Sequence, residues 1–393
     1  MTAEVAQESH PILEAARVLQ PIIRSEANAI EAGRRLTPTV VEGMKRAGIF
    51  GMTMPRAWGG PELDPLMQIR VIEALAEADG SVGWCAMINS DGGYFGACLE
   101  EHIAREMYRN LETPTASSLI FVGRADRVAD GYRVNGRWPF SSGCQHSGWV
   151  YLTCAIYENG TERMVADGIP ERRVCILPVD EVQILDTWYT TGLRGSGSHD
   201  IQIAEIIVPP QQCMPFPLKA LRSEALYRWP LTFLLNAPGV PLGIARGAIN
   251  DFTELALRKR TTISNVMGRP VMLSEEAYAQ TALARAQALV GSARAYIFEV
   301  TGEMWRCLVS RERLSLRLRG IYRLALTNTF DACLEAVMGL YKVVGGSAVY
   351  AAEPLDRRLR DLTTINQHTI NSPKILETVG KILFGMDVRD ALI

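Results

Sequence analysis

The spacing of hydrophobic residues changes twice along the chain and divides it into three regions. In residues 11–110, apolar residues recur at helical intervals, and Thr37-Pro38 and Asp64-Pro65 are typical helix starts. From about residue 113 the period becomes two, which indicates strands, and the helical period returns near Pro238. We expect strands at 115–121, 132–140, 149–157, 174–178, 182–188 and 201–208, followed by helices at 239–260, 273–308, 312–341 and 371–384.

This order of elements predicts an α+β protein with three domains. Residues 1–112 form a helical domain, residues 113–215 a β-domain and residues 216–393 a four-helix bundle. Turn sequences such as Asn135-Gly136 separate several strands and no long helix intervenes. The β-domain is therefore expected to be an antiparallel barrel or sandwich, and the C-terminal helices are long enough for an antiparallel bundle.

Composition and charge narrow the class of protein. The net charge is −2, which argues against a nucleic-acid binder, and no uninterrupted apolar run reaches the about 20 residues of a membrane helix. The N-terminus is too polar for a signal peptide. The eight cysteines form no CxxC pair, so they are expected to be free thiols with no disulfide framework and no metal site. We therefore expect a cytoplasmic protein.

Two segments between predicted strands have unusual compositions. The run from Trp138 to Trp149, WPFSSGCQHSGW, combines aromatic rings, hydroxyls and a histidine. Such a mixture suits a flat, hydrogen-bonding ligand such as a flavin ring, although an ordinary barrel rim is the alternative. The run from Gly192 to Ser198, GLRGSGS, lies between two strands and reads as a glycine-rich connection, since a phosphate loop would lead into a helix.

A third segment, residues 345–368, is rich in charge and ends in a histidine. Its acidic and basic residues around 356–361 are most simply an ion-paired or solvated helix face. His368 follows in a polar, uncharged stretch. With only five histidines in the chain, it is one of few residues that could exchange protons near neutral pH.

Taken together, these segments resemble the acyl-CoA dehydrogenase fold family over essentially the whole chain. The resemblance rests on Gly48-Ile-Phe with Pro55 and Gly59-Gly60, on Trp188 through GLRGSGS to Val208-Pro209, and on Gly345-Gly with Pro354-Leu-Asp-Arg-Arg-Leu-Arg-Asp361. The resemblance implies a helical domain, a β-domain and a four-helix bundle, in agreement with the hydrophobic pattern. It also implies a homotetramer with flavin at subunit interfaces.

The chain departs from true dehydrogenases at the catalytic base. Those enzymes need a carboxylate that removes the substrate α-proton. Here the position eight residues after Asp361 is Thr369, and the other usual place, around Pro241, has no acid between residues 225 and 250. The family's flavin motif keeps Arg260 but loses its Phe-Gly. A dehydrogenase or related FAD-dependent oxidoreductase would need a relocated base, for example Glu353.

The sequence more closely resembles the oxygenase components of two-component flavin monooxygenases, such as those for p-hydroxyphenylacetate and hydroxy-seco-androstane-dione. The SSGC-x-H-x-x-W pattern of that group appears as Ser141 to Trp149, and His368 stands seven residues after Asp361 as in that group. The resemblance implies reduced FMN or FAD as a diffusible cofactor, supplied by a separate NAD(P)H-dependent flavin reductase. It implies O2 as cosubstrate, reacting through a flavin C4a-hydroperoxide that hydroxylates a small phenolic or aromatic molecule.

The same resemblance assigns roles to individual residues. His368 is the expected base, and Ser142 faces flavin N5. Phe140 and Trp188 wall the flavin ring, Ser118 or its neighbour Ser117 contacts flavin or substrate, and Arg260 serves the flavin phosphate. The segments 84–95 and 226–235 are expected to shape the substrate pocket.

Plainer interpretations remain open for some of these residues. Trp188 could belong to the barrel core, Ser118 could be an ordinary strand hydroxyl, and His146 could be a turn residue that bonds the backbone, so His146 is left out of the catalytic set. A flavin-free scaffold without enzymatic activity is the third overall reading, after the monooxygenase and the dehydrogenase.

Overall fold

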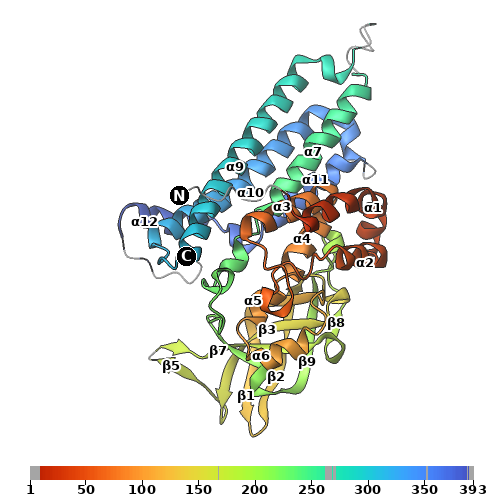
Figure 1. Ribbon diagram of the computed structural model, residues 1–393. Coiled ribbons are helices and arrows are strands. Elements are labelled where there is room, and N and C mark those ends of the chain that lie inside the picture. The colour runs from red at the N-terminus through yellow and green to blue at the C-terminus, as the bar shows by residue number, and fades with distance from the viewer. Residues whose placement is uncertain are drawn as a thin grey trace.

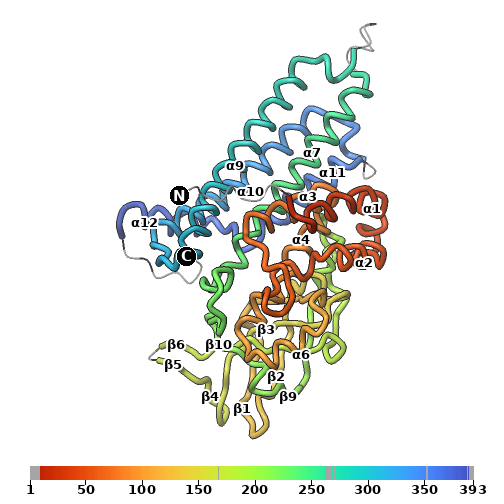
Figure 2. The backbone as a smooth tube through the Cα atoms, viewed as in Figure 1, coloured from red at the N-terminus to blue at the C-terminus, as the bar shows by residue number. Residues whose placement is uncertain are grey.

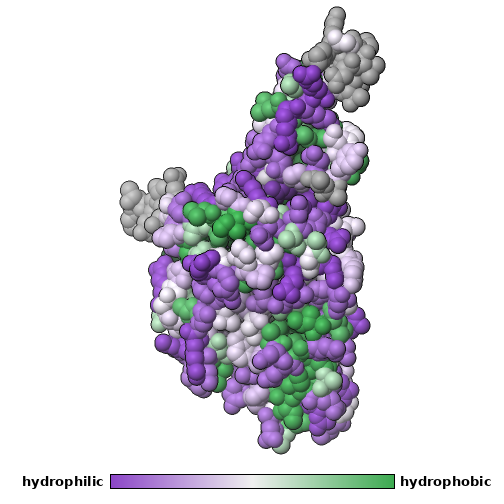
Figure 3. Space-filling model, turned by 90° about the vertical axis from the view of Figure 1, so that its right-hand side faces the viewer, coloured by the Kyte–Doolittle hydropathy of each residue, from purple (hydrophilic) through white to green (hydrophobic). Residues whose placement is uncertain are grey.

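A computed structural model of the chain describes residues 9–166, 168–261, 268, 271–350, 353–386 and 388. Long C-terminal helices form one end of the molecule, a β-sheet forms the other, and the N-terminal helices lie between them (Figure 1). Apolar surface gathers over the sheet end on the face drawn in Figure 3, whereas the end of the long helices is mainly hydrophilic.

The N-terminal region is helical, as its hydrophobic pattern predicts. Asp64 and Asp79 cap two of its helices by accepting backbone N–H bonds in the first turn. The helix after Asp79 is almost wholly buried, which explains why its sequence is apolar on every side. The helices are α1 (Pro11–Gly33), α2 (Pro38–Arg46), α3 (Pro65–Ala78), α4 (Gly80–Asn89), α5 (Gly92–Gly96) and α6 (Glu101–Met107).

The middle region is a mixed sheet with the strand order β10-β7-β3-β1-β2-β9-β8, in which β4 pairs with β3. A separate hairpin, β5–β6, projects from this end of the molecule (Figure 2). The strands are β1 (Thr115–Val128), β2 (Gly131–Ser141), β3 (Trp149–Glu158), β4 (Thr161–Glu162), β5 (Met164–Ala166), β6 (Ile169–Pro170), β7 (Arg172–Pro178), β8 (Gln183–Leu185), β9 (His199–Val208) and β10 (Cys213–Phe216).

One strand pair differs from the expected antiparallel pattern. After β2, the chain makes a 3₁₀ turn at Cys144–His146, crosses the end of β1 and pairs with its far side, so β3 runs parallel to β1. The other strand pairs are antiparallel. This crossing places the segment after Ser141 against α4, because Asn89 at the end of α4 donates to the carbonyl of Ser142.

The C-terminal region is a helical bundle, but its helices do not all fall where the pattern predicts. The charged segment after residue 353 is itself a helix that packs against α7 and α10, while the last helix packs against α10. Close packing of α7 on α3 depends on Gly243, where a Cβ would lie 2.3 Å from the carbonyl oxygen of Glu73. The helices are α7 (Gly239–Arg258), α9 (Ala277–Val309), α10 (Leu316–Val344), α11 (Pro354–Ile365) and α12 (Lys374–Leu383).

Helix α10 contains a long apolar stretch. By length and composition, residues 316–349 meet the criteria for a membrane span. In the structure, α10 packs against α7, α9, α11 and α12, and residues such as Tyr322 and Phe330 are fully buried. Packing in the bundle therefore accounts for part of its apolar character.

Candidate active site

A chain of three serine hydroxyls is buried between α4 and the sheet. Ser142 directly follows β2, and its Oγ lies 2.7 Å from Oγ of Ser198. Ser198 lies a further 2.7 Å from Oγ of Ser196, which donates to the carbonyl of Leu193 over 2.8 Å. The glycine-rich connection predicted at residues 192–198 thus supplies hydroxyl partners for Ser142.

The hydrogen bonds among these three serines fix the direction in which each hydroxyl donates. A carbonyl oxygen only accepts, so Ser196 uses its single proton on Leu193. Ser198 must then donate to Ser196, and Ser142 must donate to Ser198. Toward any further partner, the Ser142 oxygen can only accept a hydrogen bond.

Trp84 joins Ser142 to His368. Its indole N–H donates to the Ser142 oxygen over 2.9 Å. The same ring meets the imidazole of His368 edge-on, with ring centroids 5.2 Å apart and planes at 68°. Two residues predicted to be catalytic from the sequence, Ser142 and His368, therefore share one buried tryptophan as a neighbour.

The hydrogen bonds of His368 define its tautomer. Nδ1 accepts from the backbone N–H of Ile370 over 3.3 Å, so the proton of the neutral ring sits on Nε2. Burial, aided by the positive charge of Arg323, lowers the pKa of His368 to about 4. The ring is therefore neutral at pH 7 and offers an N–H donor at Nε2.

Asn89 and His146 hold Ser142 from the other side. The amide nitrogen of Asn89 donates to the carbonyls of Thr115 and Ser142, which leaves its oxygen as an acceptor for Nε2 of His146 at 2.9 Å. Burial, with the charges of Lys45 and Arg35, lowers the pKa of His146 to about 4. His146 is thus a neutral donor that orients Asn89 and, through it, the backbone at Ser142.

Helix α11 positions the glycine-rich connection at residues 192–198. Asp361 accepts from the backbone N–H of Leu193 over 2.6 Å. Burial, reinforced by the nearby negative charge of Asp79, raises the pKa of Asp361 to about 7. A Cβ at Gly192 would lie 2.0 Å from the carbonyl oxygen of Arg360, so this connection and α11 touch directly. The helix that precedes His368 therefore also anchors the loop that carries Ser196 and Ser198.

Phe140 and Trp188 lie together at the rim of this site. Their rings meet edge-on at 6.2 Å with planes at 89°. Phe140 sits at an irregularity in the pairing of β2 with β9, has φ +63° and is 59% exposed. A left-handed backbone and an exposed aromatic ring are both unfavourable for an ordinary strand residue. Trp188 is only half-buried, and its indole N–H bonds the carbonyl of Leu193.

Two other predicted residues, Ser118 and Arg260, have different surroundings in the structure. Ser118 lies on β1 and is buried, but it donates its hydroxyl to the carbonyl of Pro139 over 2.8 Å. Arg260 follows the end of α7 and pairs with Met272. Ile244, near the start of α7, lies beside Gly80 of α4, so Arg260 is about 24 Å further along the helix axis. Residues 262–267, which follow Arg260 in its motif, lie outside the described part of the chain.

Sequence reasoning missed several residues that complete the site. Trp84 was expected to help shape a substrate pocket, but its bond to Ser142, 58 residues away, has no local signal. Asn89 was not singled out, and Ser198 was assigned to a plain glycine-rich turn. Only the resemblance of the GLRGSGS run to the family's middle-domain motif pointed to that loop.

Comparisons with known proteins agree with this architecture. The family model for the N-terminal domain of acyl-CoA dehydrogenases matches residues 12–102, and the model for their C-terminal domain matches residues 237–373. The chain belongs to the acyl-CoA dehydrogenase fold family. The three-part fold predicted from the sequence is therefore confirmed.

Within this family, the relatives found by sequence include flavin-dependent oxygenases. An indole-3-acetate monooxygenase of Pseudomonas putida is 28% identical over 92% of this chain and 90% of its own length. The oxygenase subunit HsaA, a flavin-dependent monooxygenase of Mycobacterium tuberculosis, is 25% identical over the full length of both chains. The oxygenase component of the FADH(2)-dependent resorcinol hydroxylase of Rhizobium is 24% identical over 94% of this chain and 92% of its own.

Solved structures show the same fold. The 3-HSA hydroxylase from Rhodococcus sp. RHA1 superimposes with a TM-score of 0.89 at 22% identity, covering 98% of this chain and all of its own. XiaF from Streptomyces, solved with FADH2 and glycerol, gives a TM-score of 0.87 at 20% identity over 96% of this chain and 95% of its own.

Proposed function

We propose that this protein is the oxygenase component of a two-component flavin-dependent monooxygenase that hydroxylates a small aromatic molecule. In the balanced reaction, reduced flavin gives up two electrons. One atom of O2 enters the aromatic ring as a hydroxyl, and the other leaves as water. The relatives named above carry out reactions of this class, and the chain covers about nine-tenths or more of each.

The observation that carries the proposal is the fixed direction of the Ser142 hydroxyl. Flavin N5 bears a hydrogen in the reduced state and is a bare acceptor in the oxidised state. Because the Ser142 oxygen can only accept, it matches reduced flavin and mismatches oxidised flavin. Such a preference suits an enzyme that must capture reduced FMN or FAD from solution and release the oxidised form.

The neighbouring residues fit a flavin ring and an aromatic substrate. Phe140 and Trp188 offer aromatic faces at the rim, beside the Ser142 hydroxyl. When bound, reduced flavin supplies the electrons that activate O2. The surrounding residues keep water away, because Trp84, Ser142 and Ser198 are all buried. Ser118 stays in the proposal as a wall residue on β1, beside β2, and its hydroxyl donates to the carbonyl of Pro139.

We assign His368 to the oxygen or proton of the substrate. The sequence predicts a base, and in this geometry the neutral ring offers its Nε2 hydrogen, since Nδ1 is engaged by Ile370. An N–H donor stabilises a phenolate-like oxygen as negative charge develops on it. To act as a base, the ring would first have to give up its bond to Ile370.

The remaining parts of the proposal concern partners. Arg260 is too far along α7 to serve Ser142 of its own chain, so it would reach flavin phosphate only across a subunit interface. This fits the expected homotetramer with flavin between subunits, and the exposed Phe140 and the apolar surface at the sheet end suit such contacts (Figure 3). A separate NAD(P)H-dependent flavin reductase supplies the reduced flavin.

The alternative dehydrogenase function finds less support in the geometry. Its candidate base, Glu353, lies at the start of α11, whereas His368 follows the end of that helix. The 12 residues of α11 span about 18 Å, so Glu353 is remote from the Ser142 and His368 pair.

A reconstituted assay tests the proposal. The purified protein is kept on one side of a dialysis membrane and a flavin reductase with NADH on the other, so that only small molecules pass. Formation of hydroxylated product from indole-3-acetate or a phenol is the expected result. Quantitative conversion of the electrons into hydrogen peroxide with every aromatic tested, or oxidation of acyl-CoA thioesters instead, would contradict it.

A further inference from the structure

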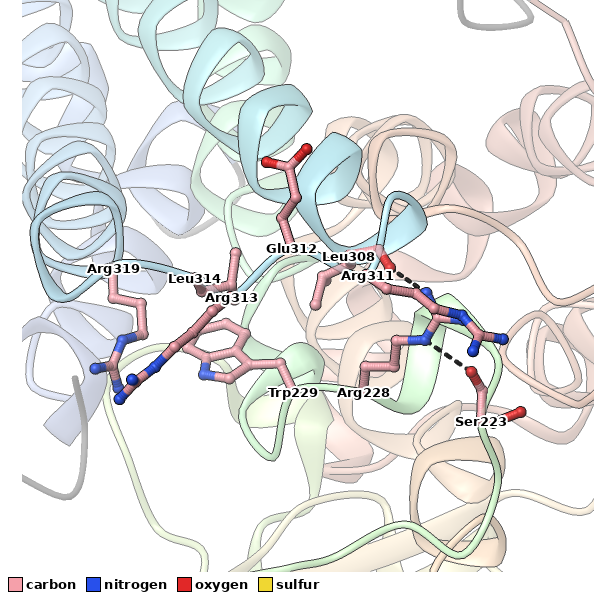
Figure 4. A pocket seen from close by; sticks show the side chains of 9 residues that line it. All are labelled: Ser223, Arg228, Trp229, Leu308, Arg311, Glu312, Arg313, Leu314 and Arg319. Carbon is pink, nitrogen blue, oxygen red and sulfur yellow. Dashed lines mark hydrogen bonds between the residues drawn. The ribbon is translucent and has the colours of Figure 1, made fainter.

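A separate pocket opens where the segment before α7 meets the end of α9 and the start of α10 (Figure 4). Its volume is about 490 Å³. Sites for small ligands usually have volumes of about 300–1,000 Å³. Neither Ser142 nor Ser198 nor His368 lines this pocket.

The lining of the pocket carries a strong excess of positive charge. Four arginines and one glutamate face it, namely Arg228, Arg311, Arg313, Arg319 and Glu312. In Figure 4 the Glu312 carboxylate points away from the guanidinium groups. No salt bridge joins Arg311 or Arg313 to a carboxylate within the described part of the chain. The whole protein has a net charge of −2, so this local concentration of cations is a marked departure.

Two of the arginines, Arg228 and Arg319, have defined neighbours in the structure. Arg228 donates to the backbone carbonyls of Leu308 and Ser223, which ties the segment before α7 to the end of α9 (Figure 4). Burial, together with the positive charge of Arg313, lowers the pKa of Arg319. Like charges that are held close together repel one another, and an anion between them relieves that repulsion.

The floor of the pocket is aromatic and leads toward His368. Trp229 lies between the arginine pairs in Figure 4 and packs edge-on against Tyr322, with ring centroids 6.3 Å apart. The next residue of α10, Arg323, donates to the carbonyl of Ile370 over 2.9 Å. Ile370 is also the residue that bonds His368. One turn of α10 thus connects the floor of this pocket with the His368 site.

We propose that this pocket binds the anionic group of an aromatic acid, with Arg313 and Arg319, which lie together on one side of Trp229 in Figure 4, holding its carboxylate and Trp229 lying against its ring. Guanidinium groups bind carboxylates through paired, charge-assisted hydrogen bonds, and indole is a good partner for flat rings. The inference goes beyond the proposed function, because it adds a binding site for aromatic acids that is separate from the Ser142 and His368 site.

Calorimetric binding of a matched pair of ligands tests this inference. Indole-3-acetate and indole-3-acetamide share one ring system and differ in charge. The full-length protein should bind the acid at least tenfold more tightly than the amide, and added salt should weaken binding of the acid only. In Arg313→Gln/Arg319→Gln the preference should fall to within about twofold. Neither residue is fully buried, so the variant should fold normally.

A nearby arginine provides the control. Arg317 is exposed in the same segment but does not line the pocket, so Arg317→Gln should keep the preference for the acid. Equal binding of acid and amide by the wild-type protein, or equal loss in Arg317→Gln, would overturn the inference.

The remaining outcomes separate this inference from the proposed function. If the double variant lost affinity for reduced FMN but not for reduced riboflavin, the pocket would belong to the flavin phosphate and the inference would fall. If the wild-type protein bound reduced FMN but neither indole ligand, the inference alone would fail. If it bound neither reduced flavin nor an aromatic ligand, the proposed function would fail with it.

Discussion

The indole N–H of Trp84 donates a hydrogen bond to the hydroxyl oxygen of Ser142 across 2.9 Å. These residues are 58 positions apart, one on a buried helix and the other at the end of a strand. The bond occupies one lone pair of the Ser142 oxygen, while the hydroxyl proton is directed to Ser198. One lone pair remains, and in the proposed site it determines which redox state of flavin is preferred.

Removing the Ser198 hydroxyl should weaken the preference for reduced flavin. In Ser198→Ala, the Ser142 proton loses its acceptor and can turn toward a bare flavin N5. We expect the ratio of Kd for oxidised FMN to Kd for reduced FMN to fall about tenfold, the effect of one mismatched hydrogen bond. Anaerobic fluorescence titration measures both constants. Ser147→Ala is the matched control, because Ser147 is also buried and its hydroxyl donates to the backbone carbonyl of Gly143.

Replacing His368 should separate product formation from flavin oxidation. In His368→Ala, flavin oxidation should continue while hydroxylated product falls at least tenfold and hydrogen peroxide rises in proportion. His368→Gln restores an N–H near the position of Nε2 and should retain activity within a few-fold. If both variants lost product equally, His368 would instead act as the base that the sequence predicts.

Arg260 should act on the flavin of a neighbouring subunit. Arg260→Ala should weaken binding of reduced FMN roughly tenfold and leave reduced riboflavin unaffected, because only FMN carries a phosphate. Oligomers assembled from a mixture of Arg260→Ala and Ser142→Ala chains should regain some sites that bind reduced FMN tightly. In such oligomers, Ser142 of one chain can share a site with Arg260 of another. Unchanged FMN affinity in Arg260→Ala would remove this residue from the site.

His368 should make the protein less stable in acid. The unfolded chain takes up a proton at this residue near its ordinary pKa of 6.5, whereas the folded pKa is lowered to about 4. Between these values the unfolded state binds more protons, so stability falls as the pH drops through this range. The full shift corresponds to at most about 3 kcal/mol.

Comparison with His368→Gln isolates this contribution from those of other groups, such as the buried carboxyl of Asp361. Denaturant unfolding at pH 7 and pH 4.5 should show that the unfolding free energy of the variant, relative to that of the wild-type protein, is higher at the lower pH. A difference in unfolding free energy that does not change with pH would contradict the lowered pKa.

The sequence predicted the elements of the fold well because local signals define them. Caps at Asp64 and periodic apolar residues specify helices, and alternation specifies strands. The parallel pairing of β1 with β3 was not predictable in this way, because it depends on where the chain crosses after Ser141. The segment Pro354–Ile365 is the ion-paired helix that its charges predicted, but its packing on α7 and α10 was not predictable, because those partners are distant in sequence.

The candidate site was predictable only in part. Ser142 and His368 were found through motif resemblance, and the structure brings both against Trp84. The serine chain and the support from Asn89 depend on long-range hydrogen bonds that no local pattern reveals. Arg260 shows the reverse case, because the arginine of the family's flavin motif is kept, without its Phe-Gly, while its position in the single chain is remote from Ser142.

A single turnover with isotopically labelled O2 tests the central claim most directly. Protein, reduced FMN and indole-3-acetate are mixed without oxygen, labelled O2 is added, and the product is examined by mass spectrometry. We expect an aromatic product that carries one labelled oxygen atom per flavin oxidised, with little hydrogen peroxide. With a panel of phenols and indoles, products without label, or complete conversion of the electrons into hydrogen peroxide, would contradict it.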